Sequence, residues 1–315
     1  MIRFMDNIQL IFLSPSFNEV VGDVLRQRLK SSGHLNVVTK PEDLDKVKQL
    51  FTKGNKVLAI DPLFCNWTVP NMLISKITNL KAICLMTRSA DWVDASFTRE
   101  LGIPLTNTRD FYVEAVSEWA IMMMFCLARR IPLVAKSGWQ QRYGKFQGVE
   151  VMGKTVGIIG MGQIGQRIAQ QCQGLGMKVQ YWSPHTHNDR YWYVSLNKLL
   201  ATSDVVFPTY RLSAGERMLP GETKLNRLGR KAILIDVVRI DNKDHEFLLR
   251  QVAKDKLFGY GFEEDGGNHF DKYKGNVWAG PALAWVTDRA MKLQAESWVE
   301  SVVQATKGNF PNRVN

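Results

Sequence analysis

The sequence predicts an α/β protein that contains two doubly wound parallel sheets. Apolar segments of strand length alternate with helical patterns along the chain, which is typical of a parallel sheet covered by helices. This alternation occurs in two separate blocks. A glycine-rich turn between a strand and a helix lies in the second block, at residues 160–165. The chain is therefore expected to form two domains, and the turn distinguishes the second from the first.

The first block begins near the N-terminus. Its strand candidates are short apolar segments, and helical patterns lie between or beside them. We expect strands at residues 8–14, 57–60 and 82–86, and helices at residues 18–30 and 69–77.

The second block repeats this pattern further along the chain. An apolar helix at residues 114–130 precedes it, and a terminal helix at residues 288–307 follows it. We expect its strands at residues 155–159, 178–182, 205–208, 232–238 and 259–263.

Residues 154–165 read KTVGIIGMGQIG and predict a dinucleotide-binding turn. Gly160 permits the tight turn, Gly162 lets a pyrophosphate approach the backbone, and Gly165 lets the helix pack on its strand. The free N–H groups and the positive end of the helix dipole then face the phosphates. Because an apolar strand precedes the motif and a helix and a second strand follow it, the context agrees with this interpretation.

Composition limits the classes of function open to this chain. Its 315 residues are 45% hydrophobic and 23% charged, which is typical of a globular protein large enough for two cores. The formal net charge is +11, but lysines and arginines are scattered and mixed with acids. We therefore expect no nucleic-acid partner, and explain the excess charge by an acidic small molecule and a cofactor phosphate.

The same sequence indicates no membrane partner and a cytoplasmic location. No apolar run approaches the roughly 20 residues that span a bilayer, and the first residues lack the layout of a secretory signal. The four cysteines show no metal-ligand spacing, so we expect no metal and reduced, inert thiols at Cys65, Cys84, Cys126 and Cys172.

Short stretches along most of the chain carry a family resemblance. They are LKAI at 80–83, DWVD at 91–94, LGIPLTNT at 101–108, EAVSEWA at 114–120, GKTVGIIGMGQIG at 153–165, SDVV at 203–206, AILIDVVR at 232–239, GYGFE at 259–263 and NV at 276–277. In this order and spacing they resemble the D-isomer-specific 2-hydroxyacid dehydrogenase family, which includes glyoxylate and hydroxypyruvate reductases. The resemblance implies a Rossmann-like nucleotide domain at 104–284, inserted into a smaller flavodoxin-like substrate domain formed by residues 1–103 and 285–315. It also implies an active site between the domains, and a homodimer.

The resemblance implies a catalytic arginine at Arg239, whose planar guanidinium suits bidentate contact with a substrate carboxylate. The family also uses a histidine that exchanges the hydroxyl proton and a carboxylate that keeps this histidine basic. Both of these positions depart from the family pattern. Ala282 stands where the histidine is usual, and Asn268, counted from Glu263, stands where the carboxylate is usual.

Two explanations of this departure remain open. In the first, the site still transfers hydride and takes its proton from another group, with His269 as the nearest substitute; His269 is alternatively a solvated loop residue. In the second, the chain binds its cofactor without fast turnover and acts as a sensor or scaffold. General acid–base assistance is worth about 10² to 10⁴ in rate, so its loss slows hydride transfer without abolishing it.

The segment MTRSAD at residues 86–91 replaces the glycines that family members tend to have on the substrate side. Arg88 and Ser89 are therefore candidates for direct binding of an anionic group. Alternatively, Arg88 only pairs with Asp91.

Cofactor choice depends on Ser183, at the end of the second strand of the nucleotide domain. An acidic residue there would bind the ribose 2′-hydroxyl and repel a 2′-phosphate, so a serine favours NADP over NAD. His185, His187 and Arg190 are candidate phosphate partners, or part of an ordinary surface loop. Other cofactor contacts that the resemblance implies are Gln163, Ile164, Thr209, Val238 and Glu263.

The prediction is therefore an NAD(P)-dependent oxidoreductase. It transfers hydride between a nicotinamide and a small anionic 2-hydroxy or 2-oxo acid. The alternative is a catalytically impaired NAD(P)-binding protein.

Overall fold

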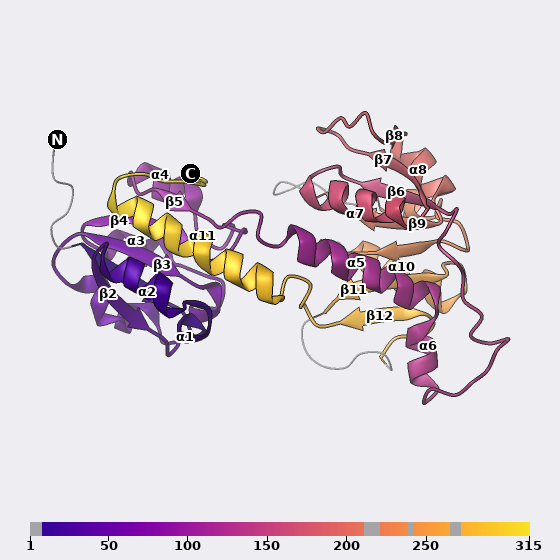
Figure 1. The fold of residues 1–315 in the computed structure, drawn as a ribbon, viewed down its shortest axis with the longest axis horizontal. Coiled ribbons are helices and arrows are strands. Elements are labelled where there is room, and N and C mark those ends of the chain that lie inside the picture. Colours follow the sequence, from indigo (N-terminus) through magenta and orange to yellow (C-terminus); the bar gives the residue numbers. More distant parts are fainter. Residues whose placement is uncertain (1–7, 211–220, 239–241, 265–271) are drawn as a thin grey trace. The chain divides into compact units, whose positions relative to one another are not determined.

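The computed structural model describes residues 8–210, 221–238, 242–264 and 272–315 (Figure 1). The chain forms two compact units, one of Met1–Tyr112 with Thr287–Asn315 and one of Val113–Val286. Each unit contains one parallel sheet with helices on both faces. The predicted fold class is confirmed.

The unit boundaries lie beyond the positions that we expected, after residues 103 and 284. A short strand, β5 (Leu105–Thr106), pairs with β4 (Leu80–Leu85) through Ile83 and Cys84. Because this pairing extends the first sheet, the residues up to Tyr112 belong to the first unit.

The first unit has a five-stranded parallel sheet of order β2-β1-β3-β4-β5. Its remaining strands are β1 (Gln9–Leu13), β2 (His34–Val38) and β3 (Lys56–Ile60). Its helices are α1 (Phe17–Val20), α2 (Asp23–Lys30), η1 (Leu44–Lys46), η2 (Lys48–Phe51), η3 (Pro62–Phe64), α3 (Asn71–Lys76), α4 (Ala95–Glu100) and α11 (Asp288–Thr306).

Successive strand residues of this sheet face opposite layers. Leu10 and Phe12 belong to the cluster that includes Trp298 of α11, whereas Ile11 and Leu13 face the cluster that includes Leu73 of α3. Figure 1 shows α11 lying along α2 over the sheet, in agreement with the contacts between these helices. The C-terminal helix is therefore part of the core of the first unit.

Two predictions for this unit need correction. The helix expected at 18–30 is two helices, because Val21 is buried and extended (φ −99°, ψ 94°) and Gly22 is extended as well. Strand β2 was not predicted. It lies at the sheet edge, and its exposed or half-buried residues lack the continuous apolar pattern of a central strand.

The second unit has a seven-stranded sheet of order β12-β11-β10-β9-β6-β7-β8, in which every pairing is parallel. Its strands are β6 (Thr155–Ile159), β7 (Lys178–Trp182), β8 (Trp192–Tyr193), β9 (Val205–Pro208), β10 (Ile233–Ile235), β11 (Gly259–Glu263) and β12 (Val277–Gly280). Its helices are α5 (Val113–Ala128), α6 (Ile131–Lys136), α7 (Gln163–Gly174), α8 (Leu196–Thr202), α9 (Glu222–Leu225) and α10 (Asn242–Ala253).

Helices cover both faces of this sheet. Helices α5 and α7 pack side by side on one face, and α8 and α10 cover the other (Figure 1). The chain leaves β10 earlier than the predicted residue 238, because the buried Asp236 carboxylate accepts a hydrogen bond from the Val238 N–H (2.8 Å). The apolar helix predicted at 114–130 ends at Ala128, and Arg130 takes the left-handed conformation (φ 54°) before α6.

The four cysteines are free thiols, and Cys84 and Cys172 are buried. Burial raises the pKa of each of these two thiols to about 12, so both stay protonated and unreactive. None of the described helices is long and apolar enough to cross a bilayer.

Candidate functional site

The glycine turn joins β6 to α7 with the geometry that a dinucleotide requires. Gly160 has φ +97°, and a Cβ there would lie 2.6 Å from the Cβ of Tyr210. A Cβ on Gly165 would lie 2.1 Å from the Gly160 carbonyl oxygen, whereas Gly162 has no neighbouring atom within 4 Å. Two glycines are therefore needed for packing, and the third leaves the backbone open to a ligand.

Helix α7 offers its N-terminus to this open space. Its N-cap is Gly162, and no side chain caps the helix, so its first N–H groups are available to an anion. Gln163 and Ile164 form the first turn, with Gln163 exposed and Ile164 half-buried. The residues of the turn fit the pyrophosphate of a dinucleotide.

Thr209 follows β9 and fixes the shape of the turn from the neighbouring strand. Its hydroxyl donates a hydrogen bond to the Gly160 carbonyl oxygen (2.7 Å), and its N–H donates to the Ile159 carbonyl oxygen (2.8 Å). We predicted Thr209 as a direct cofactor contact. In the structure its hydroxyl is bound to the backbone of the turn.

Ser183 follows β7 at the same edge of the sheet, and it is 8% exposed. Its hydroxyl accepts a hydrogen bond from the Thr186 N–H (3.2 Å) and closes the loop after the strand. Two of the three candidate phosphate partners are engaged, because His187 pairs with Asp189 (2.7 Å) and Arg190 donates to Gln173 (2.8 Å).

His185 has no hydrogen bond to a described residue. Its ring lies 6.2 Å from the ring of Tyr210. It is exposed, and it is the one candidate phosphate partner of these three that keeps both ring nitrogens open to a ligand within the part of the chain that the structure describes.

Glu263 ends β11 and ties the segment after β12 to the sheet. Its carboxylate accepts a hydrogen bond from the Ala284 N–H (2.9 Å), and the Glu264 N–H donates to the Gly280 carbonyl oxygen (2.7 Å). Ala282 lies within this tied segment and is half-buried. Ala282, whose side chain has no proton to exchange, therefore lies between two residues whose backbone is hydrogen-bonded, Gly280 and Ala284.

The carboxyl ends of β6, β7, β9, β10 and β11 meet at one edge of the parallel sheet, which brings the predicted cofactor residues together. These are Gly160, Gly162, Gln163, Ile164, Gly165, Ser183, Thr209, Val238 and Glu263. The order of the strands reverses between β6 and β9, and such a switch point is where ligands of open α/β sheets bind. Arg239, Asn268 and His269 lie outside the described residues.

Two residues at this edge were not singled out from the sequence. Asp236 is 4% exposed and orients the backbone at Val238. Tyr210 packs against Gly160. The turn motif indicated which glycines matter, but no sequence signal indicated which side chain would press on them.

A hydrogen-bonded pair lies beneath the same edge, on the face covered by α10. The His245 Nδ1 atom and the Tyr260 hydroxyl are 3.0 Å apart, and the His245 ring lies 4.5 Å from that of Phe262. Burial lowers the pKa of His245 and raises the pKa of Tyr260 well above its ordinary value. Both groups are therefore neutral at pH 7.

The loop after β4 in the first unit holds the other predicted binding residues. The Arg88 carbonyl oxygen accepts from the Asn107 side chain (2.7 Å), and the Ser89 carbonyl oxygen accepts from the Trp92 indole (2.9 Å). Helix α11 supports the start of this loop, because Gln294 donates to the Met86 carbonyl oxygen (3.0 Å).

The contacts of the side chains in this loop distinguish the two alternatives for Arg88, which are direct binding of an anion and pairing with Asp91. The Asp91 carboxylate accepts from the Ser89 hydroxyl, and no ion pair joins Arg88 to Asp91. The Arg88 side chain is exposed and has no hydrogen-bond or ion-pair partner among the described residues. Arg88 is thus available to an anion, whereas the Ser89 hydroxyl is engaged.

Residues 121–264 match the family model for the NAD-binding domain of D-isomer-specific 2-hydroxyacid dehydrogenases. A glyoxylate reductase of Thermococcus gammatolerans is 26% identical, over 96% of this chain and 94% of its own length. A glycerate dehydrogenase of Methylorubrum extorquens is 28% identical, over 76% of this chain and 81% of its own. The chain therefore contains an NAD-binding domain of the D-isomer-specific 2-hydroxyacid dehydrogenase type. The matched segment contains the glycine turn, so the second unit is this NAD-binding domain.

Solved structures share the fold. The glyoxylate reductase of Paecilomyes thermophila is 22% identical, with a TM-score of 0.83 over 98% of this chain and 99% of that one. An acyclic imino acid reductase in complex with NADPH and D-Arg is 20% identical, with a TM-score of 0.82 over 98% of this chain and all of that one. The two sheets of this chain therefore share the fold of these two reductases.

Proposed function

We propose that this chain transfers hydride between NADPH or NADP⁺ and a small 2-oxo or 2-hydroxy acid. The observation that carries the proposal is the open backbone at Gly162 in front of α7, at the switch point of the sheet. The relatives named glyoxylate reductase and glycerate dehydrogenase support a small anionic substrate.

The bound dinucleotide supplies or accepts the hydride, and the chain positions it. Gly160, Gly162 and Gly165 shape the pyrophosphate site, and the N–H groups at Gln163 and Ile164 face it. Ser183 places no carboxylate near the ribose, which supports NADP over NAD, although both can be accommodated. In this proposal Val238 and Glu263 flank the nicotinamide.

The substrate carboxylate needs a cation, and the sequence offers two. Arg239 is proposed from the family resemblance to hold the carboxylate and polarise the carbonyl. Arg88 is proposed as a second anion-binding group because it is exposed and has no partner among the described residues. Ser89 remains a candidate through its backbone, since its hydroxyl is bound to Asp91.

Slow turnover is part of the proposal. Ala282 has no proton to exchange, and the second catalytic residue that we propose, His269, rests on its place in the sequence. A missing general acid costs about 10² to 10⁴ in rate. The competing proposal is a protein that binds NAD(P) and does not turn over.

The experiment uses the full chain at high concentration with NADPH or NADH and a panel of glyoxylate, hydroxypyruvate and pyruvate. Loss of absorbance at the reduced-nicotinamide band with one of these acids supports the dehydrogenase. Cofactor binding without oxidation by any acid supports the competing proposal.

The double variant Ala282→His with Asn268→Glu tests the proton donor. It should raise the rate about 100-fold and add a dependence on pH near the imidazole pKa. The control is Ala282→Asn, which is polar but does not titrate and should leave the rate unchanged. A double variant with no gain would contradict the assignment of Ala282 to the proton-donor position.

We also propose a homodimer and a cytoplasmic location, the first from the family resemblance and the second from the sequence. Light scattering of the purified chain and fractionation of the producing cells test these two points.

A further inference from the structure

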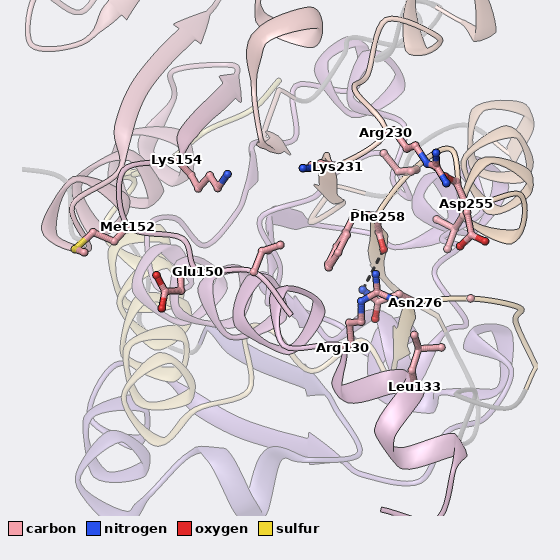
Figure 2. Close-up of a pocket in the computed structure, with 14 residues that line it drawn as sticks. Arg130, Leu133, Glu150, Met152, Lys154, Arg230, Lys231, Asp255, Phe258 and Asn276 are labelled. Atoms are coloured by element: carbon pink, nitrogen blue, oxygen red, sulfur yellow. Dashed lines mark hydrogen bonds between the residues drawn. The ribbon is translucent and has the colours of Figure 1, made fainter. Parts of the chain in front are cut away.

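A pocket of about 700 Å³ opens in the NAD-binding domain at the edge of the sheet opposite the glycine turn (Figure 2). Lys154, Phe258 and Asn276 line it, and each directly precedes a strand, namely β6, β11 and β12. The amino ends of parallel strands share one edge, so the pocket belongs to the amino edge. Its volume is in the range of small-molecule sites.

The lining of this pocket is cationic. Arg130, Lys154, Arg230 and Lys231 contribute positive charge, and Glu150 and Asp255 are the carboxylates, which leaves a net charge of +2. Both carboxylates are exposed to water, whereas Arg130 and Lys154 are half-buried. Figure 2 shows Lys154 and Lys231 with their ammonium groups turned toward one another. The arrangement complements a dianion.

Two of these cations have no acceptor within the described parts of the chain. The Arg130 guanidinium lies over the Phe258 ring, 4.5 Å from its centroid, and its buried Nε atom has no hydrogen-bond partner. Lys231 has no ion pair or hydrogen bond through its side chain. Lys231 is exposed, whereas the half-buried charge of Arg130 is unfavourable without an acceptor, and a bound anion would supply one.

The other two cations are only partly engaged. Lys154 lies 3.6 Å from Asp204, and Arg230 donates to the Asp255 carbonyl oxygen (3.0 Å). Both side chains keep further donors for a ligand.

The rest of the lining is apolar, with one unsatisfied acceptor. Leu133, Val149 and Leu257 line the pocket together with Phe258. Asn276 is 3% exposed, and its amide donates to two carbonyl oxygens, whereas its Oδ1 atom is buried without a donor. This lining suits a ligand that carries a carbon skeleton besides its charge.

We propose that the pocket binds a small organic phosphate. A phosphomonoester carries a charge of about −1.5 to −2 at pH 7, which matches the net charge of the lining better than a single carboxylate does. The phosphate accepts hydrogen bonds from Lys231, Lys154 and Arg130, and the carbon skeleton packs on Phe258. This site is separate from the cofactor turn, and it does not depend on the proposed reaction.

Calorimetric titration of the full chain with phenyl phosphate tests the site, with and without saturating NADPH. Binding should be the same in both titrations. Lys231→Gln should weaken it about tenfold or more, since it removes a charge-assisted hydrogen bond. The matched control is Lys178→Gln, which removes an exposed lysine at the same edge, where β7 begins, but outside the pocket. It should leave binding unchanged.

Further ligands and variants distinguish a phosphate site from a general anion site. Benzoate, with the same ring and one carboxylate charge, should bind more weakly than phenyl phosphate, and equal binding would overturn the choice of phosphate. Arg130→Lys keeps the charge and should weaken binding less than Lys231→Gln weakens it. No heat, heat abolished by NADPH, or equal losses in Lys231→Gln and Lys178→Gln would each overturn the site. The titration without NADPH measures binding to this pocket without any cofactor. Failure of the chain to bind NADPH would therefore count against the proposed function only.

Discussion

The two edges of the seven-stranded sheet use their polar groups in opposite ways. At the carboxyl edge, the side chains of Ser183, Thr209 and Glu263 are hydrogen-bonded to backbone, and the open groups are the N–H groups of the glycine turn. At the amino edge, the cations Arg130 and Lys231 have no acceptor in the described chain.

This difference shows what each edge can recognise. Backbone groups fixed by side chains form a rigid cradle that accepts one shape, which suits a pyrophosphate. Free cationic side chains can adjust to any small anion of the right charge. We therefore expect substitutions in the glycine turn to act through shape, and those at the amino edge to act through charge.

Gly165→Ala should have the largest effect. A Cβ at Gly165 would meet the Gly160 carbonyl oxygen at 2.1 Å and the Thr209 hydroxyl at 2.7 Å, so the turn must deform. We expect fluorescence titration to detect no NADPH binding. The control is Gly174→Ala at the other end of α7, where a Cβ meets nothing within 4 Å and binding should be retained. Unchanged NADPH affinity in Gly165→Ala would show that cofactor binding does not depend on the shape of the glycine turn.

Ser183→Asp should have the next largest effect, on the choice of cofactor. The new carboxylate can still accept from the Thr186 N–H, and it would repel a 2′-phosphate. The ratio of kcat/KM for NADPH to that for NADH should fall about tenfold or more, a size typical of interactions with a charged group. Ser183→Ala adds no charge and should leave the ratio in place. If both variants give the wild-type ratio, Ser183 does not select the cofactor.

Thr209→Val should have a smaller effect, because it removes one neutral hydrogen bond and keeps the shape of the side chain. The Gly160 carbonyl oxygen would lose its 2.7 Å donor, and NADPH affinity should fall about fivefold. Thr209→Ser retains the hydroxyl and should bind as the wild type does. The reverse result, a loss of NADPH affinity in Thr209→Ser and none in Thr209→Val, would show that the hydrogen bond from Thr209 to Gly160 does not support cofactor binding.

The smallest effect should be on the pH dependence of stability, through His245. Burial holds the pKa of His245 below its ordinary value, so the unfolded chain takes up this proton first as the pH falls. Folding stability should therefore decrease as the pH falls below about 6.5. In His245→Asn the melting temperature should change less between pH 7 and pH 5.5. An equal change in both proteins would assign the effect to other groups.

The sequence predicted the core strands well because they are short, continuous apolar runs. Strands β6, β7, β9 and β11 were expected at the residues where they occur. Strand β2 and the break at Val21 were missed because an edge strand and a buried extended residue are defined by contacts with distant parts of the chain. Local pattern therefore predicts the interior strands of both sheets and misses the edge strands β2, β5, β8 and β12.

By itself, the sequence determined that a parallel α/β sheet carries a glycine turn between a strand and a helix. Such a turn requires glycines at a fixed spacing, and that spacing can be read directly from the sequence. The tertiary structure decided which polar side chains remain available to ligands. It bound Thr209 to the turn and left Arg88 without a described partner. It also gathered Arg130, Lys154 and Lys231 at the amino edge. Lys154 and Lys231 precede β6 and β10, whose parallel alignment brings them to one edge, and Arg130 reaches the same pocket from the segment between α5 and α6.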